Sequence, residues 1–264
     1  MNYNHVMSIA LKDLKEAFSS ISVWGPMIGI PLFFAIVLPA FTVYISKYAG
    51  PALLTRILGV AAATAGISSY DVAKFAFIKF FAINILGPIF LTMPIITATV
   101  IAADSFAGEK ERKTAEALMS TPATDSELLA GKTLASFIPA VGLTVFIFVI
   151  YALITNYLSV ASYGSAVFPN ILWYMMLANS PFLALTTIGM IVLVSSRVRN
   201  IKEAQQISSL LVLPILVIPF LSVFNFATLD FWFLFDIMVV LMASSVAVFY
   251  ISKRFFDRER FIVA

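Results

Sequence analysis

Long, uninterrupted apolar runs dominate the sequence. Six of these runs hold 20 or more mostly apolar residues, and a helix of about 20 residues crosses the roughly 30 Å of hydrocarbon in a bilayer. Membrane-spanning β-strands would instead alternate apolar and polar residues over about ten positions. The pattern therefore predicts an all-α polytopic membrane protein with six transmembrane helices. We expect spans at about residues 23–46, 80–102, 134–156, 172–195, 207–226 and 231–251.

Two further segments are predicted to lie at the membrane surface. In residues 1–22, apolar residues recur at helical spacing and charged residues fill the other face, which predicts an N-terminal amphipathic interfacial helix. A plain cytoplasmic tail is the alternative. The apolar set is Met7, Ala10, Leu11, Leu14 and Phe18, and the polar set is Lys12, Asp13, Lys15 and Glu16. Residues 51–67, in a long outer loop at 47–79, form either a surface helix or a seventh span.

Composition limits the chemistry that the chain can perform. Its residues are 61% hydrophobic and 12% charged, against about 25% charged in a soluble domain. There is no cysteine, and the single histidine, His5, precedes every span. Disulfides, thiolate metal sites and thiol catalysis are therefore excluded, and we expect neither a catalytic residue nor a metal site.

Basic residues are distributed unevenly between the two sides of the membrane. Thirteen of the 17 fall in the segments expected on one side, and this excess of Lys and Arg marks the cytoplasmic side. We therefore predict a protein of the cell membrane with both termini in the cytoplasm and no nucleic-acid partner. The thirteen are Lys12, Lys15, Lys110, Arg112, Lys113, Lys132, Arg197, Arg199, Lys202, Lys253, Arg254, Arg258 and Arg260.

The predicted cytoplasmic loop at residues 103–133 is the most charged part of the chain, and it ends in Gly131-Lys132-Thr133. That tripeptide resembles the end of a phosphate-binding P-loop, G-x-x-x-x-G-K-[ST]. The first glycine of the motif would fall at Ser126, however, and no strand precedes it. We conclude that the match is accidental and that this chain does not hydrolyse ATP.

The loop is instead predicted to form two short helices. The first runs from Asp104 to Met119, is supported by ion pairs of Glu109 with Arg112 and Lys113, and stops at Pro122. A capping box, with Thr124 as N-cap and Glu127 three residues later, starts the second helix, which leads into the third span. A solvated loop is the alternative. The rigid design and the apolar patch at Ala115, Leu118 and Met119 favour a surface that binds a soluble partner.

This loop also resembles a known family. "DSFAGEKERKTAEALMSTPATDSELLAGK" is similar to the E-K-E-R-x-T-x-E-x-L-x-S-T-P…GK signature of the ABC type-2 permease family. The N-terminal "ALKDLKEAF" and the later "SRVRNIKEAQQISSLLVLP" resemble other segments of the family. One departure is the short "LVIPFLSVFNFATLDFWF", where many relatives have a longer connection between the last two spans.

The resemblance implies a half-transporter of six helices. It would dimerise with a second permease copy or a paralogue, and two separate P-loop ATPase subunits would supply the ATP and Mg²⁺, so this chain needs no cofactor. The resemblance also implies a coupling helix that docks on the ATPase and a smaller contact in a second loop. The coupling residues would be Glu109, Glu111, Arg112, Thr114, Glu116, Leu118, Ser120, Thr121 and Pro122, and the second contact Arg197, Arg199, Asn200 and Glu203.

Polar residues within the spans are candidates for a transport pathway, and they are few. The candidates are Asn84, Thr92, Asn179 and Asp236. For Asn179 the alternative is an interhelical hydrogen bond beside a proline kink. For Asp236 it is snorkelling to the membrane interface or a partner such as Lys79. Ion-coupled transporters generally need buried charge, which is nearly absent here. We therefore expect export of a hydrophobic or amphipathic substrate, with a secondary transporter or channel, and then a membrane scaffold, as the alternatives.

Overall fold

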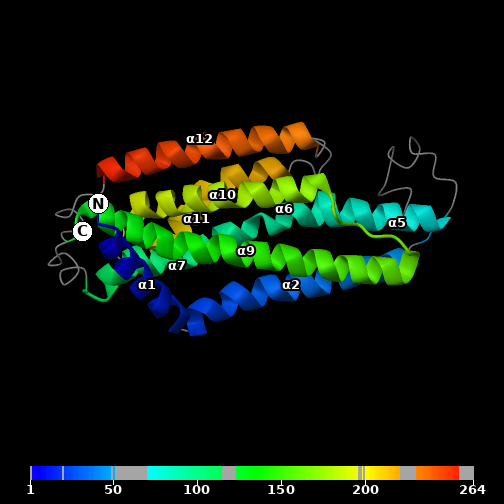
Figure 1. The fold of residues 1–264 in the computed structure, drawn as a ribbon, viewed down its shortest axis with the longest axis horizontal. Helices are drawn as coiled ribbons and strands as arrows, with labels where there is room; N and C mark the ends of the chain where they lie inside the picture. The colour runs from blue at the N-terminus through cyan, green and yellow to red at the C-terminus, as the bar shows by residue number, and fades with distance from the viewer. Residues whose placement is uncertain are drawn as a thin grey trace.

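The structure is a computed structural model that describes residues 2–19, 21–48, 50, 70–114, 123–195, 198, 200–220 and 230–255. Within these ranges all regular elements are helices (Figure 1). They are α1 (Tyr3–Ser19), α2 (Ile21–Tyr48), α5 (Tyr70–Phe80), the π-helix η1 (Phe81–Ile85), α6 (Leu86–Phe90), α7 (Thr92–Glu111), α9 (Asp125–Tyr163), α10 (Ile171–Ser195), α11 (Ile201–Phe220) and α12 (Phe231–Phe255).

Five helical segments are long and apolar enough to cross a membrane, so this is a multi-pass membrane protein. They are Met27–Tyr48, Asp71–Glu111, Asp125–Tyr163, Ile171–Ser195 and Phe231–Ser252. Each covers most or all of one predicted span. The remaining predicted span, 207–226, coincides with α11 as far as residue 220, and its last six residues lie outside the described part of the chain, as does the stretch at 51–67.

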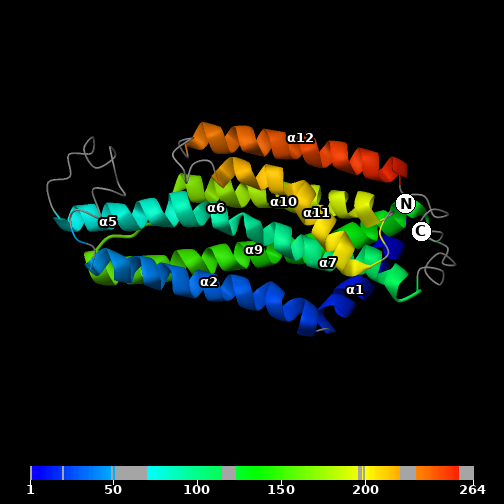
Figure 2. The same ribbon diagram turned by 180° about the vertical axis from the view of Figure 1, so that it is seen from behind.

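The helices form an elongated bundle with two distinct ends (Figures 1 and 2). We call the end where α7, α10 and α12 finish, and where α9 and α11 begin, the charged end. There α1 crosses the bundle obliquely before α2 runs back along it. Towards the opposite end, the centre of the bundle is filled by buried aromatic rings from α6, α9, α10 and the loop before α10. They are Phe90, Phe148, Tyr151, Phe168 and Trp173, and the centroids of neighbouring rings lie 4.3–5.9 Å apart.

The second span is continuous from Asp71 to Glu111 but irregular in its middle. The π-helix η1 shifts the backbone hydrogen bonds, and the hydroxyl of Tyr151 on α9 donates to the carbonyl of Ala82 within it at 3.3 Å. A turn at Leu91 then separates α6 from α7. Single turns of π-helix are frequent at functional sites in other proteins.

The first of the two helices predicted for the cytoplasmic loop ends earlier than the sequence pattern predicts. We expected it to continue to Met119, but α7 ends at Glu111. Its last carbonyls are taken by two backbone bonds, from Thr114 N–H to Glu109 O and from Lys113 N–H to Lys110 O. With Lys113 at φ 57°, this is a Schellman motif, which reverses the chain after a helix. The motif usually has glycine at the left-handed position, so a lysine there hides the helix end in the sequence.

The second helix begins as predicted. Thr124 accepts a hydrogen bond from the Glu127 N–H, and the Glu127 carboxylate accepts one from the Thr124 N–H, which completes the capping box. From there α9 runs without a break through the third span. Gly131-Lys132-Thr133 therefore lies inside a helix rather than in a phosphate-binding loop.

Candidate functional site

The helix α1 packs on the start of α9 through a face that the sequence pattern did not predict. Its buried residues are Val6, Ala10, Asp13 and Ala17, whereas Leu11 and Phe18 of the predicted apolar face are 57% and 45% exposed. The placement of Asp13 on the polar, solvent-facing side is therefore wrong. The exposed Leu11 and Phe18 remain available to lipid, so the interfacial position of α1 stays a prediction.

A glycine lets α1 come this close to α9. A Cβ atom at Gly131 would lie 2.8 Å from the side chain of Ile9 and 3.0 Å from the carbonyl oxygen of Val6. Both distances are shorter than carbon normally tolerates, and one of the two atoms belongs to the backbone. The contact therefore depends on the missing side chain at this position.

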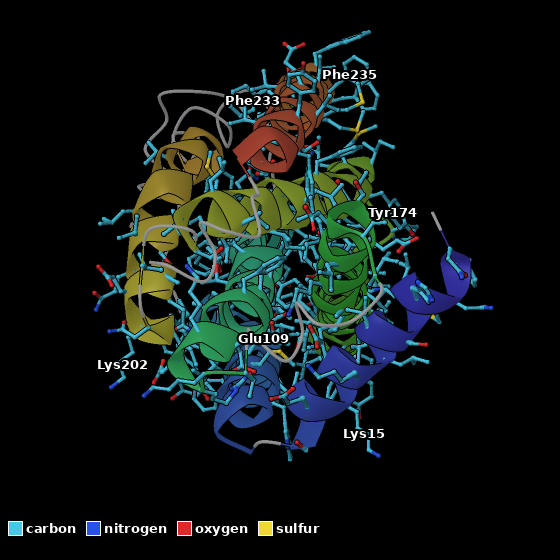
Figure 3. The ribbon with its side chains drawn as sticks, turned by 90° about the vertical axis from the view of Figure 1, so that its left-hand side faces the viewer. Lys15, Glu109, Tyr174, Lys202, Phe233 and Phe235 are labelled. Atoms are coloured by element: carbon cyan, nitrogen blue, oxygen red, sulfur yellow. The ribbon has the colours of Figure 1, made fainter. Side chains whose placement is uncertain are left out.

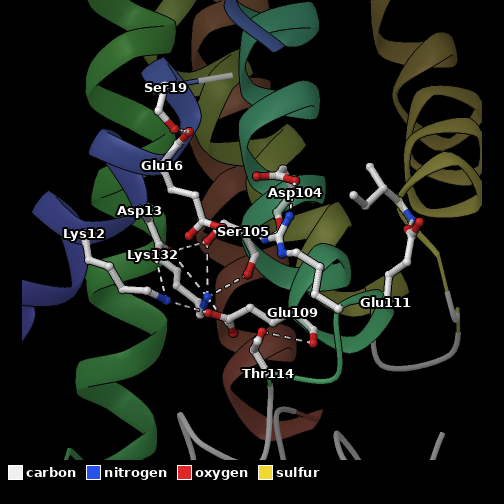
Figure 4. Close-up of polar contacts among 12 residues, drawn as sticks. Lys12, Asp13, Glu16, Ser19, Asp104, Ser105, Glu109, Glu111, Thr114 and Lys132 are labelled. Atoms are coloured by element: carbon white, nitrogen blue, oxygen red, sulfur yellow. Dashed lines mark hydrogen bonds and ion pairs between the residues drawn. The ribbon is translucent and has the colours of Figure 1, made fainter. Parts of the chain in front are cut away.

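Three helices bring opposite charges together beneath this contact (Figure 4). Lys132 of α9 places its Nζ 3.3 Å from Asp13 Oδ2 of α1 and 2.9 Å from Glu109 Oε2 of α7. The exposed fractions of Lys132, Asp13 and Glu109 are only 1%, 6% and 2%. We call these three residues the buried charge cluster. Seen from the charged end, Glu109 lies among the helices, whereas Lys15 and Lys202 point outward (Figure 3).

Hydrogen bonds from the same helices complete the cluster. Lys132 Nζ donates to the carbonyl of Ser105 at 2.6 Å, and the Ser105 hydroxyl donates to Asp13. The contact between Lys132 and Glu109 Oε2 lacks good hydrogen-bond geometry and is chiefly Coulombic. Removing charges from water costs several kcal/mol per ion, and such a cluster often adds little net stability. We expect its main effect to be on how α1, α7 and α9 are positioned.

A fourth charge balances the cluster. Lys12 lies 3.2 Å from Glu109 and 3.6 Å from Asp13, so two lysines face two carboxylates. Partial burial alone would lower the pKa of Lys12, but the two carboxylates outweigh it and raise that pKa above its usual value. Lys12 is therefore expected to be charged near neutral pH.

The last two residues of α7, Lys110 and Glu111, also make contacts within the protein. Lys110 Nζ donates to the carbonyl of Ser195, the last residue of α10, at 2.7 Å. The Glu111 carboxylate accepts from the N–H of Ile201, the first residue of α11, at 2.9 Å. These contacts hold both ends of the short connection between α10 and α11.

Arg112 ties the same end of α7 to α1. Its guanidinium lies 2.9 Å from the carboxylate of Asp104, which is eight residues earlier on α7. It also lies 3.1 Å from the carboxylate of Glu16 on α1. The predicted local pairs of Glu109 with Arg112 and Lys113 are therefore wrong. The Arg112 side chain is directed to Asp104 and Glu16, the chain turns at Lys113, and Glu109 instead pairs with residues distant in sequence.

The first residues of the chain are fastened to the first turn of α9. Glu127 accepts hydrogen bonds from the backbone N–H groups of Asn2 and Thr124, and His5 Nδ1 lies 3.4 Å away. These bonds, that from Asn2 first, lower the pKa of Glu127 to about 2. The carboxylate is thus ionised at neutral pH and acts as a fixed acceptor for the N-terminus.

The expected docking residues divide into three groups. Glu109 is buried, so its side chain is not open to a partner, whereas Glu111, Arg112, Thr114, Asn200 and Glu203 are exposed. The Asn200 side chain caps α11 by accepting from the Glu203 N–H at 3.0 Å. The remaining expected residues lie outside the described part of the chain. They are Glu116, Leu118, Ser120, Thr121, Pro122, Arg197 and Arg199.

The structure does not gather the four pathway candidates at one place. Asn84 and Thr92 lie on the second span and bond to its own carbonyls, at Phe80 and Ile89. Buried Asn179 donates from α10 to the Leu234 carbonyl of α12 at 3.3 Å. This is the interhelical bond named above as its alternative role.

The last candidate, Asp236, is exposed on α12. Among the described residues, no ion pair joins it to Lys79, so the suggested partnership is absent from this chain.

Sequence reasoning missed Asp13, Ser105 and Lys132 as site residues. Two signals were present. Asp13 interrupts a stripe of small residues, Val6, Ala10 and Ala17, at helical spacing, and Lys132 is a lone charge just before an apolar span. Neither signal identifies the partner, because Asp13 and Lys132 are 119 residues apart.

Comparison with known proteins is consistent with this architecture. The family model described as "ABC-2 family transporter protein" matches residues 7–234. The match spans α1, the charged end and most of the bundle. The search of curated proteins finds no match.

Proposed function

Because the chain belongs to the ABC-2 family of transporter proteins, as a membrane subunit without catalytic activity of its own, we propose that it forms the export pathway of an ATP-driven exporter. Separate ATPase subunits would dock on the charged end and supply the energy. The observation that carries this proposal is the set of contacts at the charged end. Charged contacts from one helix end, that of α7, reach α1, α9, α10 and α11, so force applied there would spread to several spans.

We propose that docking falls on the loop between α7 and α9 and on the connection between α10 and α11. The ends of α7 and α10 and the starts of α9 and α11, which flank these two loops, lie at the same end of the bundle (Figure 2). The exposed Thr114 precedes the signature residues 115–122, and the exposed Asn200 and Glu203 are the described members of the expected second contact. The excess of basic residues supports a cytoplasmic charged end, and with it both termini in the cytoplasm of a cell-membrane protein.

The proposed substrate is hydrophobic or amphipathic. Many polar side chains of the described spans bond to backbone within the bundle, as Thr92, Asn84 and Asn179 do. A pathway between this chain and a second permease copy or paralogue would therefore be lined mainly by apolar atoms. The apolar exposed faces of α2, α9 and α12 are consistent with contact to lipid or to such a second copy.

Transport in proteoliposomes tests this function. The chain, co-expressed with the P-loop ATPase that binds it, should accumulate a fluorescent amphipathic dye in inside-out vesicles when ATP and Mg²⁺ are added. A Walker-lysine variant of the ATPase should abolish the accumulation. Transport that persists with the inactive ATPase and follows an ion gradient would instead identify a secondary transporter.

A further inference from the structure

Four consecutive charged residues at the end of α7 together contact four neighbouring helices. Glu109 binds Lys132 of α9 and Lys12 of α1, at 2.9 and 3.2 Å. Lys110 binds the last carbonyl of α10, and Glu111 the first N–H of α11. Arg112 then reaches Glu16 on α1. Together these residues are the E-K-E-R of the signature quoted above.

Helix geometry explains how adjacent residues reach such separate partners. Successive side chains on an α-helix point about 100° apart, so four residues at a helix end project to all sides. The helix α7 is surrounded at this end by α1, α9, α10 and α11, as Figures 2 and 4 show. A run of four charged residues can therefore bind all four neighbours only at the end of a central helix.

The signs of the charges match what each neighbour offers. The C-terminus of a helix carries partial negative charge and its N-terminus partial positive charge. The positively charged Lys110 meets the C-terminus of α10, and the negatively charged Glu111 meets the N-terminus of α11. Glu109 meets two lysines, and Arg112 meets two carboxylates. An exchange of any of these signs would turn attraction into repulsion.

We propose that Glu109, Lys110, Glu111 and Arg112 form an intramolecular clamp rather than a surface that binds the ATPase. In this role they are positioning residues. They fix the ends of α1, α9, α10 and α11 on α7, so that the loop after α7 and the connection after α10 move as one body. The inference goes beyond the proposed function, because it concerns contacts within this chain alone.

The burial of Glu109 distinguishes a clamp from a docking surface. A docking carboxylate must be open to a partner, whereas Glu109 is 2% exposed and already lies against two lysines. Glu111 and Arg112 are exposed, but the Glu111 carboxylate binds the Ile201 N–H of α11 and the Arg112 guanidinium pairs with Glu16 of α1.

Hydrogen–deuterium exchange of the purified full-length protein in lipid nanodiscs tests the clamp without an ATPase. Lys132→Met should raise the exchange rate of residues 3–19 at least tenfold and leave residues 231–252 unchanged, because α12 lies against α10 away from the cluster (Figure 1). Glu111→Ala should raise exchange at residues 201–206 and leave residues 3–19 unchanged.

Conservative variants separate positioning from a general loss of stability. Glu111→Gln keeps a side-chain oxygen that can accept from Ile201 and should restore most of the protection lost in Glu111→Ala. Lys113→Ala, which removes an exposed charge just outside the clamp, should change neither peptide. Unchanged exchange in Lys132→Met and Glu111→Ala, or an equal rise in all peptides including 231–252, would overturn the clamp. Because no ATPase is present, failure of this test is separate from failure of the proposed export function.

Discussion

Replacing Lys132 by methionine is the most direct perturbation of the buried charge cluster. Methionine has nearly the same length but lacks the ammonium group, so both the charge and the hydrogen bond to the Ser105 carbonyl are lost. It leaves the carboxylates of Asp13 and Glu109, 6% and 2% exposed, with Lys12 as their remaining cation. At an effective dielectric constant of about 20, contacts of 3.3 and 2.9 Å each supply roughly 5–6 kcal/mol of gross attraction, most of which offsets desolvation.

The net effect follows from what remains after the substitution. Removing one partner of a buried ion pair typically costs about 3–5 kcal/mol. Lys12 stays within 3.6 Å of both carboxylates and can screen them, so we expect a loss near 3 kcal/mol. At about 2–4 °C per kcal/mol for a protein of this size, the midpoint of thermal unfolding in detergent should fall by roughly 6–12 °C.

A triple variant controls for the charge itself. Asp13→Asn and Glu109→Gln, added to Lys132→Met, remove all three charges at almost constant volume. Because neutral replacements of a buried ion pair are often close to neutral in stability, the triple variant should recover most of the lost midpoint. A single variant as stable as the wild type, or a triple variant less stable than the single one, would refute the reasoning.

Two further predictions concern how α1 is held on α9. Gly131→Leu should displace α1, because a Cβ atom there would lie 2.8 Å from the side chain of Ile9, whereas Gly142→Leu on the same helix, with nothing within 4 Å, should not. Limited proteolysis between α1 and α2 measures the difference, and equal cleavage of the two variants would contradict the contact. Glu127→Gln should lower the unfolding midpoint at pH 7, because the pKa of Glu127 in the folded protein, about 2, lies below its ordinary value of 4.5. The ionised carboxylate therefore stabilises the fold above pH 4.5, and this stabilisation is lost as the pH falls towards 2. Midpoints of the two proteins that differ equally at pH 7 and pH 2.5 would exclude Glu127 as the source.

Features encoded locally could be predicted from the sequence. The capping box at Thr124 and Glu127 depends on residues three positions apart, and five of the predicted spans depend on apolar length alone, so both are visible without the fold. The end of α7 was missed although it is also local, because a lysine at position 113 takes the left-handed conformation that glycine normally marks.

Features that depend on distant residues could not be predicted. On a helical wheel Asp13 and Glu16 look alike, and only the fold shows that Asp13 is directed to Lys132 while Glu16 remains near the surface beside Arg112. The signature residues were interpreted as a surface for the same reason. A charged run usually faces solvent, and here its partners are supplied by four other helices.

Co-purification from native membranes tests the central claim that a separate ATPase drives this permease through its charged end. The wild type should be compared with Glu109→Gln, which loosens the clamp, and with Glu116→Lys/Leu118→Lys, which alters the expected docking surface. We predict a P-loop ATPase, identified by mass spectrometry, with the wild type and with Glu109→Gln but not with the double variant. Absence of any ATPase from all three samples, with solute movement that follows an ion gradient in reconstituted vesicles, would contradict the account.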